Sequence, residues 1–328
     1  MEAEFDLIAR YFAPLAVGER GAYALLNDAA ILDVPAEHSL VTTLDSMVEG
    51  VHFLPDDPPD LIARKLLRVN LSDLAAMAAR PRGYLLSLAL SGDQDETWLE
   101  AFATGFGRDQ DIYDVVLLGG DTLRTPGPLT LTLTALGEVP RGQALQRGTA
   151  RAGEDIYLTG RLGEAALGLF VRLGQAAEKL PDLTAGQLDR LEAAYRLPDP
   201  PVQLGPLLPG LATACLDVSD GLMGDLGHIA NGSGLGAEVE VTRLPLAPEV
   251  RRLVEAVPER LQDVVSGGDD YQLLFTAPQE KRDAVERLSG DSGVAISRIG
   301  RMTQGDSVRL LDVQGRDVAV AQAGWTHF

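Results

Sequence analysis

Aspartate residues recur in this chain where an apolar segment meets a turn, a helix or a pair of glycines. Asp45 interrupts an apolar segment, and Asp73 lies in a segment rich in Ala and Leu. The others follow Gly-Gly pairs or bracket Val218-Ser219: Asp121, Asp217, Asp220, Asp269 and Asp270. Junctions between buried elements and loops are where α/β proteins build their sites.

Carboxylates that converge without enough Lys or Arg nearby repel one another and shift one another's pKa values. A hard divalent cation removes that conflict, and Mg²⁺ typically binds one or two protein carboxylates together with phosphate oxygens. We interpret the two Gly-Gly-Asp segments as turns in which glycine lets the backbone approach a phosphate. The chain has neither a Walker A motif nor the protein-kinase motifs, so the sequence favours a metal–phosphate site on another scaffold.

Each of these signals also has a purely structural explanation. Asp220 could be a helix N-cap, a single Gly-Gly-Asp could be an ordinary turn, and His52 could be a hydrogen-bonded structural histidine. Asp73 is harder to explain in this way, because an unpaired buried charge is costly. Taken together, the aspartates favour the metal–phosphate site.

The elements that must position these residues alternate between strand and helix patterns. In the first half we expect strands over 29–34, 40–48, 83–91, 115–118 and 129–139, and a helix from about 57 to 79. Leu129, Leu131 and Leu133 alternate with threonines, which indicates a half-buried strand. This is more antiparallel sheet than a doubly wound fold contains.

Turn-forming residues cluster over 140–153, and a length of 328 residues is typical of two domains. We place the domains at 1–140 and 141–328. The second should contain a helix from Asp220 and strands over 155–159, 212–218, 237–241, 271–276, 294–299 and 308–313. The fold class is therefore α/β, of the mixed α+β kind.

Composition narrows the range of partners. The formal net charge of −20 argues against binding to nucleic acid or to a membrane surface, although bound Mg²⁺ can reverse the sign locally. The single cysteine, Cys215, excludes an intrachain disulfide, and its apolar neighbours indicate a packing role. Because no apolar run approaches about 18 residues and the N-terminus is acidic, we expect a cytoplasmic protein.

Ordered motifs along essentially the whole chain resemble the thiamine-monophosphate kinases, members of the aminoimidazole-ribotide-synthetase-like superfamily. The first half carries Glu4-Phe5-Asp6-Leu7-Ile8, Glu49-Gly50-Val51-His52-Phe53, the segment 69–77 and Gly119-Gly120-Asp121-Thr122. The second half carries the segment 216–222, Gly267-Gly268-Asp269-Asp270-Tyr271 and the ending Gly324-Trp325-Thr326-His327-Phe328.

The resemblance implies ATP-dependent phosphorylation of thiamine monophosphate to thiamine diphosphate. It also implies a two-domain fold whose N-terminal sheets pair across a homodimer, with a C-terminal α/β domain. The implied Mg²⁺ ligands are Asp28, Thr43, Leu44 (through its carbonyl), Asp45, Asp73, Asp121, Asp217 and Asp220. The implied nucleotide contacts are Gly120, Asp121, Arg147 and Ser219. The implied substrate contacts are His52, Asp269 and Trp325.

We expect direct in-line transfer without a protein nucleophile, because the acceptor phosphate is already anionic. The chain departs from its relatives at Leu26-Asn27, where they carry Gly-Asp, at Leu44, where they carry Thr, and at Asp269, where they carry Glu. These departures leave open a non-catalytic thiamine-phosphate binder. Another ATP-dependent enzyme of the superfamily is also an alternative. The missing terminal cysteines argue against hydrogenase maturation and selenophosphate synthesis, and the His52 and Trp325 motifs argue against aminoimidazole ribotide synthesis.

Overall fold

The computed structural model describes residues 4–321 and residue 324. The chain divides into two compact units, one of residues 1–74 and 79–142 and one of residues 75–78 and 143–328. Each unit has its own β-sheet. Among the helices of the described residues, none has the length and apolar character needed to cross a membrane.

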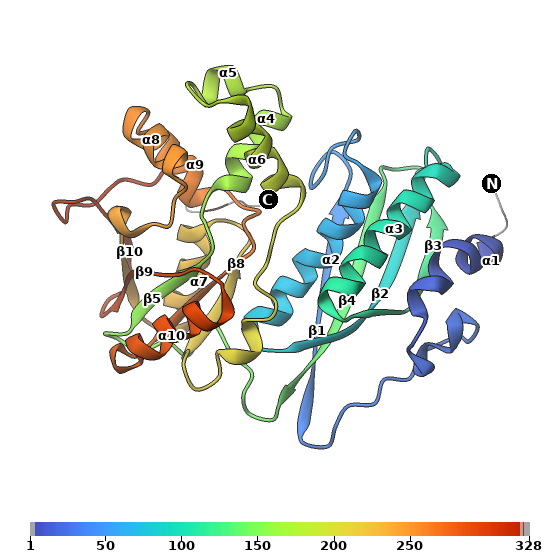
Figure 1. The fold of residues 1–328 in the computed structure, drawn as a ribbon. Helices are drawn as coiled ribbons and strands as arrows, with labels where there is room; N and C mark the ends of the chain where they lie inside the picture. The colour runs from blue at the N-terminus through green and yellow to red at the C-terminus, as the bar shows by residue number, and fades with distance from the viewer. Residues whose placement is uncertain (1–3, 322–323, 325–328) are drawn as a thin grey trace. The chain divides into compact units, whose positions relative to one another are not determined.

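The first unit is built on a four-stranded sheet in the order β1-β4-β2-β3 (Figure 1). Its elements are α1 (Glu4–Leu7), β1 (His38–Val48), α2 (Pro59–Ala76), β2 (Arg80–Leu90), α3 (Glu96–Tyr113), β3 (Val116–Arg124) and β4 (Thr130–Pro140). Strand β4 pairs antiparallel with β1 and β2, and β2 pairs parallel with β3. The predicted helix at 57–79 and the predominance of antiparallel pairing are confirmed.

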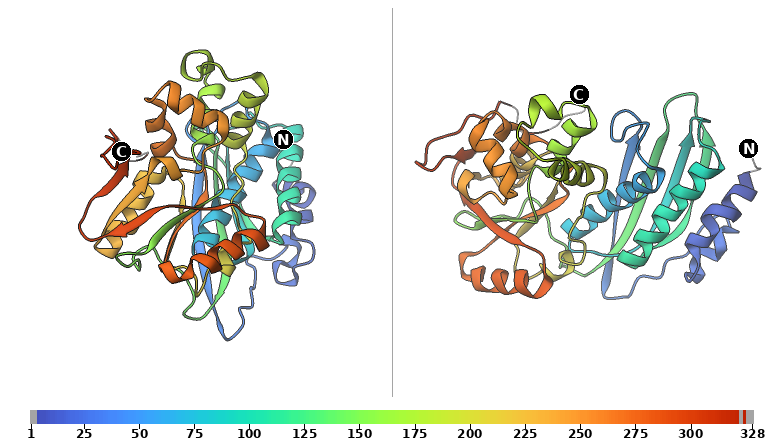
Figure 2. Two further views of the ribbon diagram at one scale, coloured as in Figure 1. Left: turned by 60° about the vertical axis from the view of Figure 1, so that its left-hand side comes forward. Right: turned by 45° about the horizontal axis from the view of Figure 1, so that its top comes forward.

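Helices α2 and α3 lie across one face of this sheet (Figures 1 and 2). The rings of Tyr84 on β2 and Phe106 on α3 stack with centroids 5.3 Å apart. Asp109 on α3 is fully buried and binds the guanidinium Nε atoms of Arg64 and Arg68 on α2, at 2.9 and 2.6 Å. Moving α2 away from α3 would leave the buried Asp109 charge without its partners, which is costly. These ion pairs therefore hold α2 at a defined position beside α3.

Two sequence predictions for the first unit are wrong. Residues 29–34 form no strand; instead the Ile31 amide donates to the Gly21 carbonyl at 2.8 Å, and Ile31 is exposed. Gly119-Gly120-Asp121 is not a turn but the middle of strand β3. A Cβ on Gly120 would collide with the Leu86 carbonyl, so the glycine is required by the close approach of β2.

The second unit is built on a six-stranded sheet in the order β10-β7-β9-β5-β8-β6. Its strands are β5 (Asp155–Thr159), β6 (Ala214–Val218), β7 (Gly236–Glu240), β8 (Gln272–Ala277), β9 (Ile296–Thr303) and β10 (Val308–Leu311). Its α-helices are α4 (Glu164–Arg172), α5 (Ala176–Lys179), α6 (Ala185–Arg196), α7 (Leu222–Ser233), α8 (Pro248–Ala256), α9 (Arg260–Ser266) and α10 (Arg282–Ser292). All strand predictions for this half are confirmed to within a few residues.

A continuous apolar core fills the second unit, where α7 packs along β6, β7 and β10. Cys215 is 2% exposed, as its apolar neighbours predict, and burial raises the pKa of its thiol. Strand β6 ends at Val218 and α7 begins at Leu222, so Ser219, Asp220 and Gly221 form the connecting loop. The fold therefore places the predicted Asp217–Asp220 segment at one end of the sheet.

Candidate functional site

In the first unit, strand β1 and helix α2 bring three of the predicted ligands together. The Thr43 hydroxyl donates a hydrogen bond to Asp73 Oδ2 at 2.6 Å. The Asp45 amide donates to Asn70 Oδ1 at 3.0 Å, and Asn70 in turn donates to the Leu66 carbonyl. Thr43 and Asp45 are two residues apart on a strand, and Asn70 and Asp73 are three apart on a helix, so each pair shares one face.

The donor atoms of this group are carboxylate, hydroxyl and amide oxygens. Mg²⁺ prefers oxygen ligands and usually keeps several waters, so it needs only one or two carboxylates from the protein. The residues present at the β1–α2 contact therefore fit the metal that the sequence predicts. Nitrogen- or sulfur-preferring metals would find no matching side chain among these residues.

Asp121 lies on the face of this sheet that α2 and α3 do not cover, which we call the open face. It pairs with Ser87, which pairs with Thr132, and the Thr132 hydroxyl lies 2.7 Å from that of Ser46. One residue further along the strands, Asp45 pairs with Leu133, Leu133 with Leu86, and Leu86 with Gly120. Because neighbouring residues of a strand face opposite sides, Asp45 and Asp121 project from different faces.

The open face contains a pocket of about 620 Å³. Four predicted site residues line it: Asp28, Leu44, Gly120 and Asp121. Leucines and the hydroxyls of Ser87, Thr132 and Thr134 complete much of the wall. The structure thus separates the first-unit ligands into two groups. Within 4–321 and 324, no three His, Cys, Asp or Glu side chains lie in an arrangement that could hold a metal ion.

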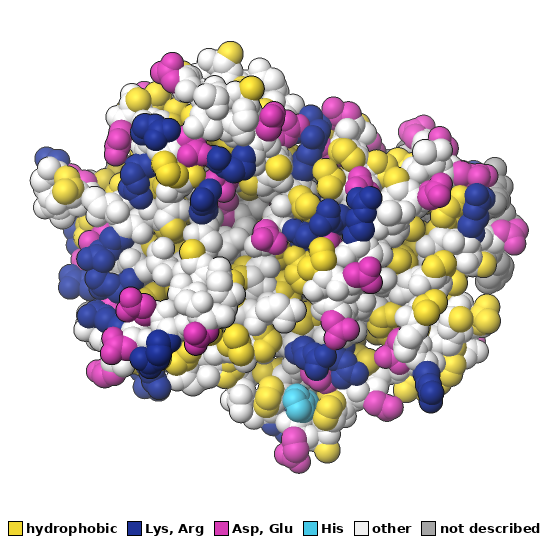
Figure 3. Space-filling view, viewed as in Figure 1, with side chains coloured by type: hydrophobic (Ala, Val, Ile, Leu, Met, Phe, Trp, Pro, Cys, Tyr) yellow, Lys and Arg dark blue, Asp and Glu magenta, His cyan; other side chains and the backbone are white. Residues whose placement is uncertain are grey.

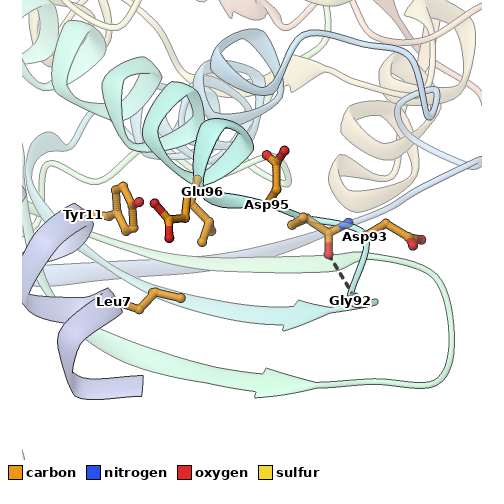
Figure 4. A pocket seen from close by; sticks show the side chains of 8 residues that line it. Leu7, Tyr11, Gly92, Asp93, Asp95 and Glu96 are labelled. Atoms are coloured by element: carbon orange, nitrogen blue, oxygen red, sulfur yellow. Dashed lines mark hydrogen bonds between the residues drawn. The ribbon is translucent and has the colours of Figure 1, made fainter. Parts of the chain in front are cut away.

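A smaller pocket of about 300 Å³ lies at the start of α3 (Figure 4). Its acidic side chains have structural partners, because Glu96 pairs with Arg10 at 3.2 Å and Asp95 accepts from the Trp98 amide at 2.8 Å. None of the predicted site residues that the structure describes lines it. On the face shown in Figure 3, acidic and basic side chains are interspersed.

His52 lies in the turn that follows β1. Its Nδ1 accepts a hydrogen bond from the Val48 amide at 3.0 Å, and its carbonyl accepts one from Lys65 Nζ at 3.2 Å. When Nδ1 accepts, the proton of a neutral imidazole is carried on Nε2. His52 is therefore held in one orientation as a potential donor through Nε2.

In the second unit, two loops run side by side and bring Asp217, Ser219, Asp220 and Asp269 into one region. The Ser219 carbonyl accepts from the Asp269 amide at 2.9 Å, and the Val218 carbonyl accepts from the Tyr271 amide at 2.8 Å. A Cβ on Gly268 would lie 2.2 Å from the Ser219 carbonyl oxygen. Glycine at 268 is thus required by the contact between the loops, in addition to any approach of a phosphate.

Asp225, a residue that the sequence analysis missed, holds the loop before α7. Its Oδ2 accepts from the amides of Asp220 and Gly221, each at 3.1 Å, and its side chain is almost fully buried. Burial, reinforced by the Asp220 charge, raises the pKa of Asp225 to about 7, while the amide donors act in the opposite direction. The only sequence signal was a carboxylate in the first turns of a predicted helix. The N-cap of α7 is Gly221, so the alternative that Asp220 caps this helix is wrong.

Asp270 fixes the neighbouring loop in a similar way. It accepts from the Gly163 amide at 2.7 Å and from the Ala165 amide at 3.4 Å, at the start of α4. Burial raises the pKa of Asp270 to about 8 against the effect of these donors. Asp269 and Tyr271 on either side adopt positive φ angles of 72° and 49°. A backbone conformation this unfavourable persists where the surrounding contacts impose it.

One further predicted site residue, Arg147, lies elsewhere. Arg147 precedes Gly148, which packs against Gly232 in the last turn of α7. Ser219 and Asp220 precede the first turn, and a 12-residue helix is about 18 Å long. The structure therefore places Arg147 near the other end of α7. Trp325 lies outside the described residues.

Comparison with known proteins identifies both halves of the chain. Residues 26–139 match the N-terminal domain, and residues 151–313 the C-terminal domain, of the AIR synthase related protein family. The thiamine-monophosphate kinase of Caulobacter vibrioides is 40% identical over 327 residues, which is 99% of this chain and 90% of the relative.

Two solved structures are similar over most of their length. The thiamine-monophosphate kinase of Stenotrophomonas maltophilia K279a has a TM-score of 0.80 and 41% identity, covering 89% of this chain and 90% of that one. AaThiL complexed with AMPPCP and TMP has a TM-score of 0.77 and 29% identity, covering 92% and 91%. With both AIR synthase related domains and a relative of this identity over almost its whole length, the chain belongs to the thiamine-monophosphate kinase family.

Proposed function

We propose that this protein transfers the γ-phosphoryl group of ATP to the phosphate of thiamine monophosphate, giving thiamine diphosphate and ADP. The observation that carries the proposal is the set of oxygen donors where β1 meets α2, in a chain 40% identical to a thiamine-monophosphate kinase. A relative solved with AMPPCP and TMP supports ATP and thiamine monophosphate as the two substrates.

The reaction needs no nucleophile from the protein. An anionic oxygen of the acceptor phosphate forms the new P–O bond, and the bond between the γ-phosphorus and the β,γ-bridging oxygen breaks, so that ADP leaves with the electron pair. Catalysis then consists of positioning and charge neutralisation. Mg²⁺, when bound, neutralises phosphate charge and polarises the group being transferred.

We assign roles to the chain's own residues accordingly. The proposed ligands of several Mg²⁺ ions are Asp28, Thr43, Leu44, Asp45, Asp73, Asp121, Asp217 and Asp220. The proposed nucleotide contacts are Gly120, Asp121, Arg147 and Ser219, and the proposed substrate contacts are His52, Asp269 and Trp325. Residues 1–140 would form the metal- and nucleotide-binding domain, and residues 141–328 the C-terminal domain. A cytoplasmic location stays a prediction.

The direct test incubates the purified protein with ATP, Mg²⁺ and thiamine monophosphate and measures thiamine diphosphate and ADP. We expect the two products in equal amounts and only with the metal. Asp121→Ala and Asp220→Ala should each lower turnover by about 10²-fold or more, and Asp111→Ala, an exposed residue of α3, should not. Calorimetric binding of thiamine monophosphate without turnover would instead support the non-catalytic binder.

We also propose that the open face of the first sheet pairs with a second copy of the chain to form a homodimer. Leu40, Leu44, Leu85 and Leu123 are 48%, 59%, 39% and 45% exposed on strands of this sheet. Sedimentation should show a dimer for the wild type and a monomer for Leu85→Glu, because a charge in an apolar interface is costly. Ile112→Glu, at an exposed position of α3, is the matched control and should remain dimeric.

A further inference from the structure

The loop between β6 and α7 directs its backbone N–H groups inward, at a carboxylate of its own chain. Asp225 Oδ2 accepts from the amides of Asp220 and Gly221 at 3.1 Å each. Consecutive amides that converge in this way form a concave anion site, of the kind that binds phosphate in many proteins. Here the protein fills that site itself.

A simple helix cap does not account for Asp225. The residue is the fourth of α7, its side chain reaches back to the loop, and only 4% of it is exposed. Its carboxylate binds the amide of Asp220 as well as that of the N-cap Gly221, so it fixes the connecting loop and not the helix end alone.

The other side of the loop is fixed as well. The Ser219 carbonyl accepts from the Asp269 amide, and Gly268 lies against the same carbonyl. With its amides bound to Asp225 and this carbonyl bound to the neighbouring loop, the backbone of 219–221 has little freedom. The groups that remain to act on a ligand are the side chains of the segment.

We infer that Asp225 is a positioning residue: it occupies the anion site formed by the amides of Asp220 and Gly221 and so presents the side chains of Asp217, Ser219 and Asp220 to the metal and nucleotide. The inference rests on the proposed function, which makes Asp217 and Asp220 metal ligands. It further implies that this loop acts on phosphate through metal and hydroxyl and not through its own amides. Removing such a supporting hydrogen-bond partner typically weakens metal binding by about 10–100-fold.

The test measures Mn²⁺ binding to the purified protein, by the loss of the free-Mn²⁺ electron paramagnetic resonance signal, together with the melting temperature. Asp225→Ala should bind Mn²⁺ about 10–100-fold more weakly than the wild type. Asp225→Asn keeps one oxygen for the two amides and should bind close to the wild-type level. Asp225→Glu keeps the charge but lengthens the side chain by one methylene, displaces the loop and should bind more weakly.

Asp155→Asn is the matched control for loss of stability. Asp155 is an almost fully buried carboxylate bound by Arg282 and Arg298, and it pairs with Ala277, at the end of β8 opposite to the Val218–Gln272 pair. We expect this variant to melt at a lower temperature with unchanged Mn²⁺ affinity. In turnover assays the loss in Asp225→Ala should depend on the metal concentration, whereas that in Asp155→Asn should not.

The outcomes distinguish failure of the positioning role of Asp225 from failure of the proposed metal ligands. Unchanged Mn²⁺ affinity in Asp225→Ala, with a lowered melting temperature like that of Asp155→Asn, overturns the positioning role. Equal loss in the Ala and Asn variants also overturns it, because the charge would then matter and not the hydrogen bonds. If Asp225→Ala does not fold, unchanged affinity in Asp225→Glu is the refuting result. A wild-type protein that binds no Mn²⁺ refutes the proposed metal ligands as well.

Discussion

Replacing Gly268 by Ala adds a single methyl group at the contact between the two loops of the second unit. The added Cβ would lie 2.2 Å from the Ser219 carbonyl oxygen, a backbone atom. Real Cβ contacts essentially never fall below 3.0 Å, so the loops must separate by at least about 0.8 Å. The neighbouring residue Ser219 is a proposed nucleotide contact, and Asp217 and Asp220 lie on the same segment as proposed metal ligands.

We expect Gly268→Ala to lose most of its activity while it still folds. A misplacement of about 1 Å at reacting groups costs roughly 10² in rate, and we expect a loss of that size in kcat/KM. Overpacking of a fitted contact costs about 1–3 kcal/mol, and each kcal/mol lowers the Tm of a domain of this size by roughly 2–4 °C. Gly268→Ala should therefore fold and melt somewhat earlier, yet be nearly inactive.

The assay is formation of thiamine diphosphate at saturating Mg²⁺, with Tm measured by differential scanning fluorimetry. Gly227→Ala is the matched control, because Gly227 lies in α7 and has nothing within 4 Å of an added Cβ. In an open helical position Ala is better than Gly by about 0.5–1 kcal/mol, so this variant should be active and slightly more stable. Wild-type kcat/KM and Tm in Gly268→Ala would show that the loop contact does not position the site.

Two further predictions follow from single contacts. Burial raises the pKa of Asp270 to about 8, so the folded state binds the proton more tightly than the unfolded state. The free energy of unfolding should therefore fall as the pH rises from about 4 to about 8. Urea unfolding at several pH values should show a flatter profile for Asp270→Asn, and parallel profiles would contradict the burial argument. Thr43→Val removes the hydroxyl that donates to Asp73 at 2.6 Å, and a hydrogen bond to a charged group is worth about 1.5–3 kcal/mol. The kcat/KM of Thr43→Val should therefore fall at least tenfold, whereas that of Thr43→Ser should stay close to wild type. Equal activities in the Val and Ser variants would show that the hydrogen bond does not orient Asp73.

Most of the elements could be predicted because their signals are local. The alternation through Leu129, Leu131 and Leu133 is a property of the strand itself, and the structure has β4 over Thr130–Pro140. The failures are places where the signal depends on a partner. Residues 29–34 are apolar but pair with no strand, and Gly119-Gly120 resembles a turn until Leu86 is seen to lie against it.

The types of the candidate ligands, their order along the chain and the family were all readable in the sequence, because ordered motifs and carboxylates at element ends are properties of the linear chain. How these ligands group in space could not be read from the sequence. Strand register places Thr43 and Asp45 beside α2 but Asp121 on the open face with Leu44, and register is set by pairing between strands distant in sequence.

Asp225 is the clearest case of what only the tertiary structure decided. In the sequence it is one more acidic residue in a helix, indistinguishable from a solvated one. Its proposed role depends on the fold of the β6–α7 loop, which turns two backbone amides toward one point, and on the burial of the carboxylate that binds them. The sequence determines which chemical groups the chain carries. Folding brings these groups together and removes them from water.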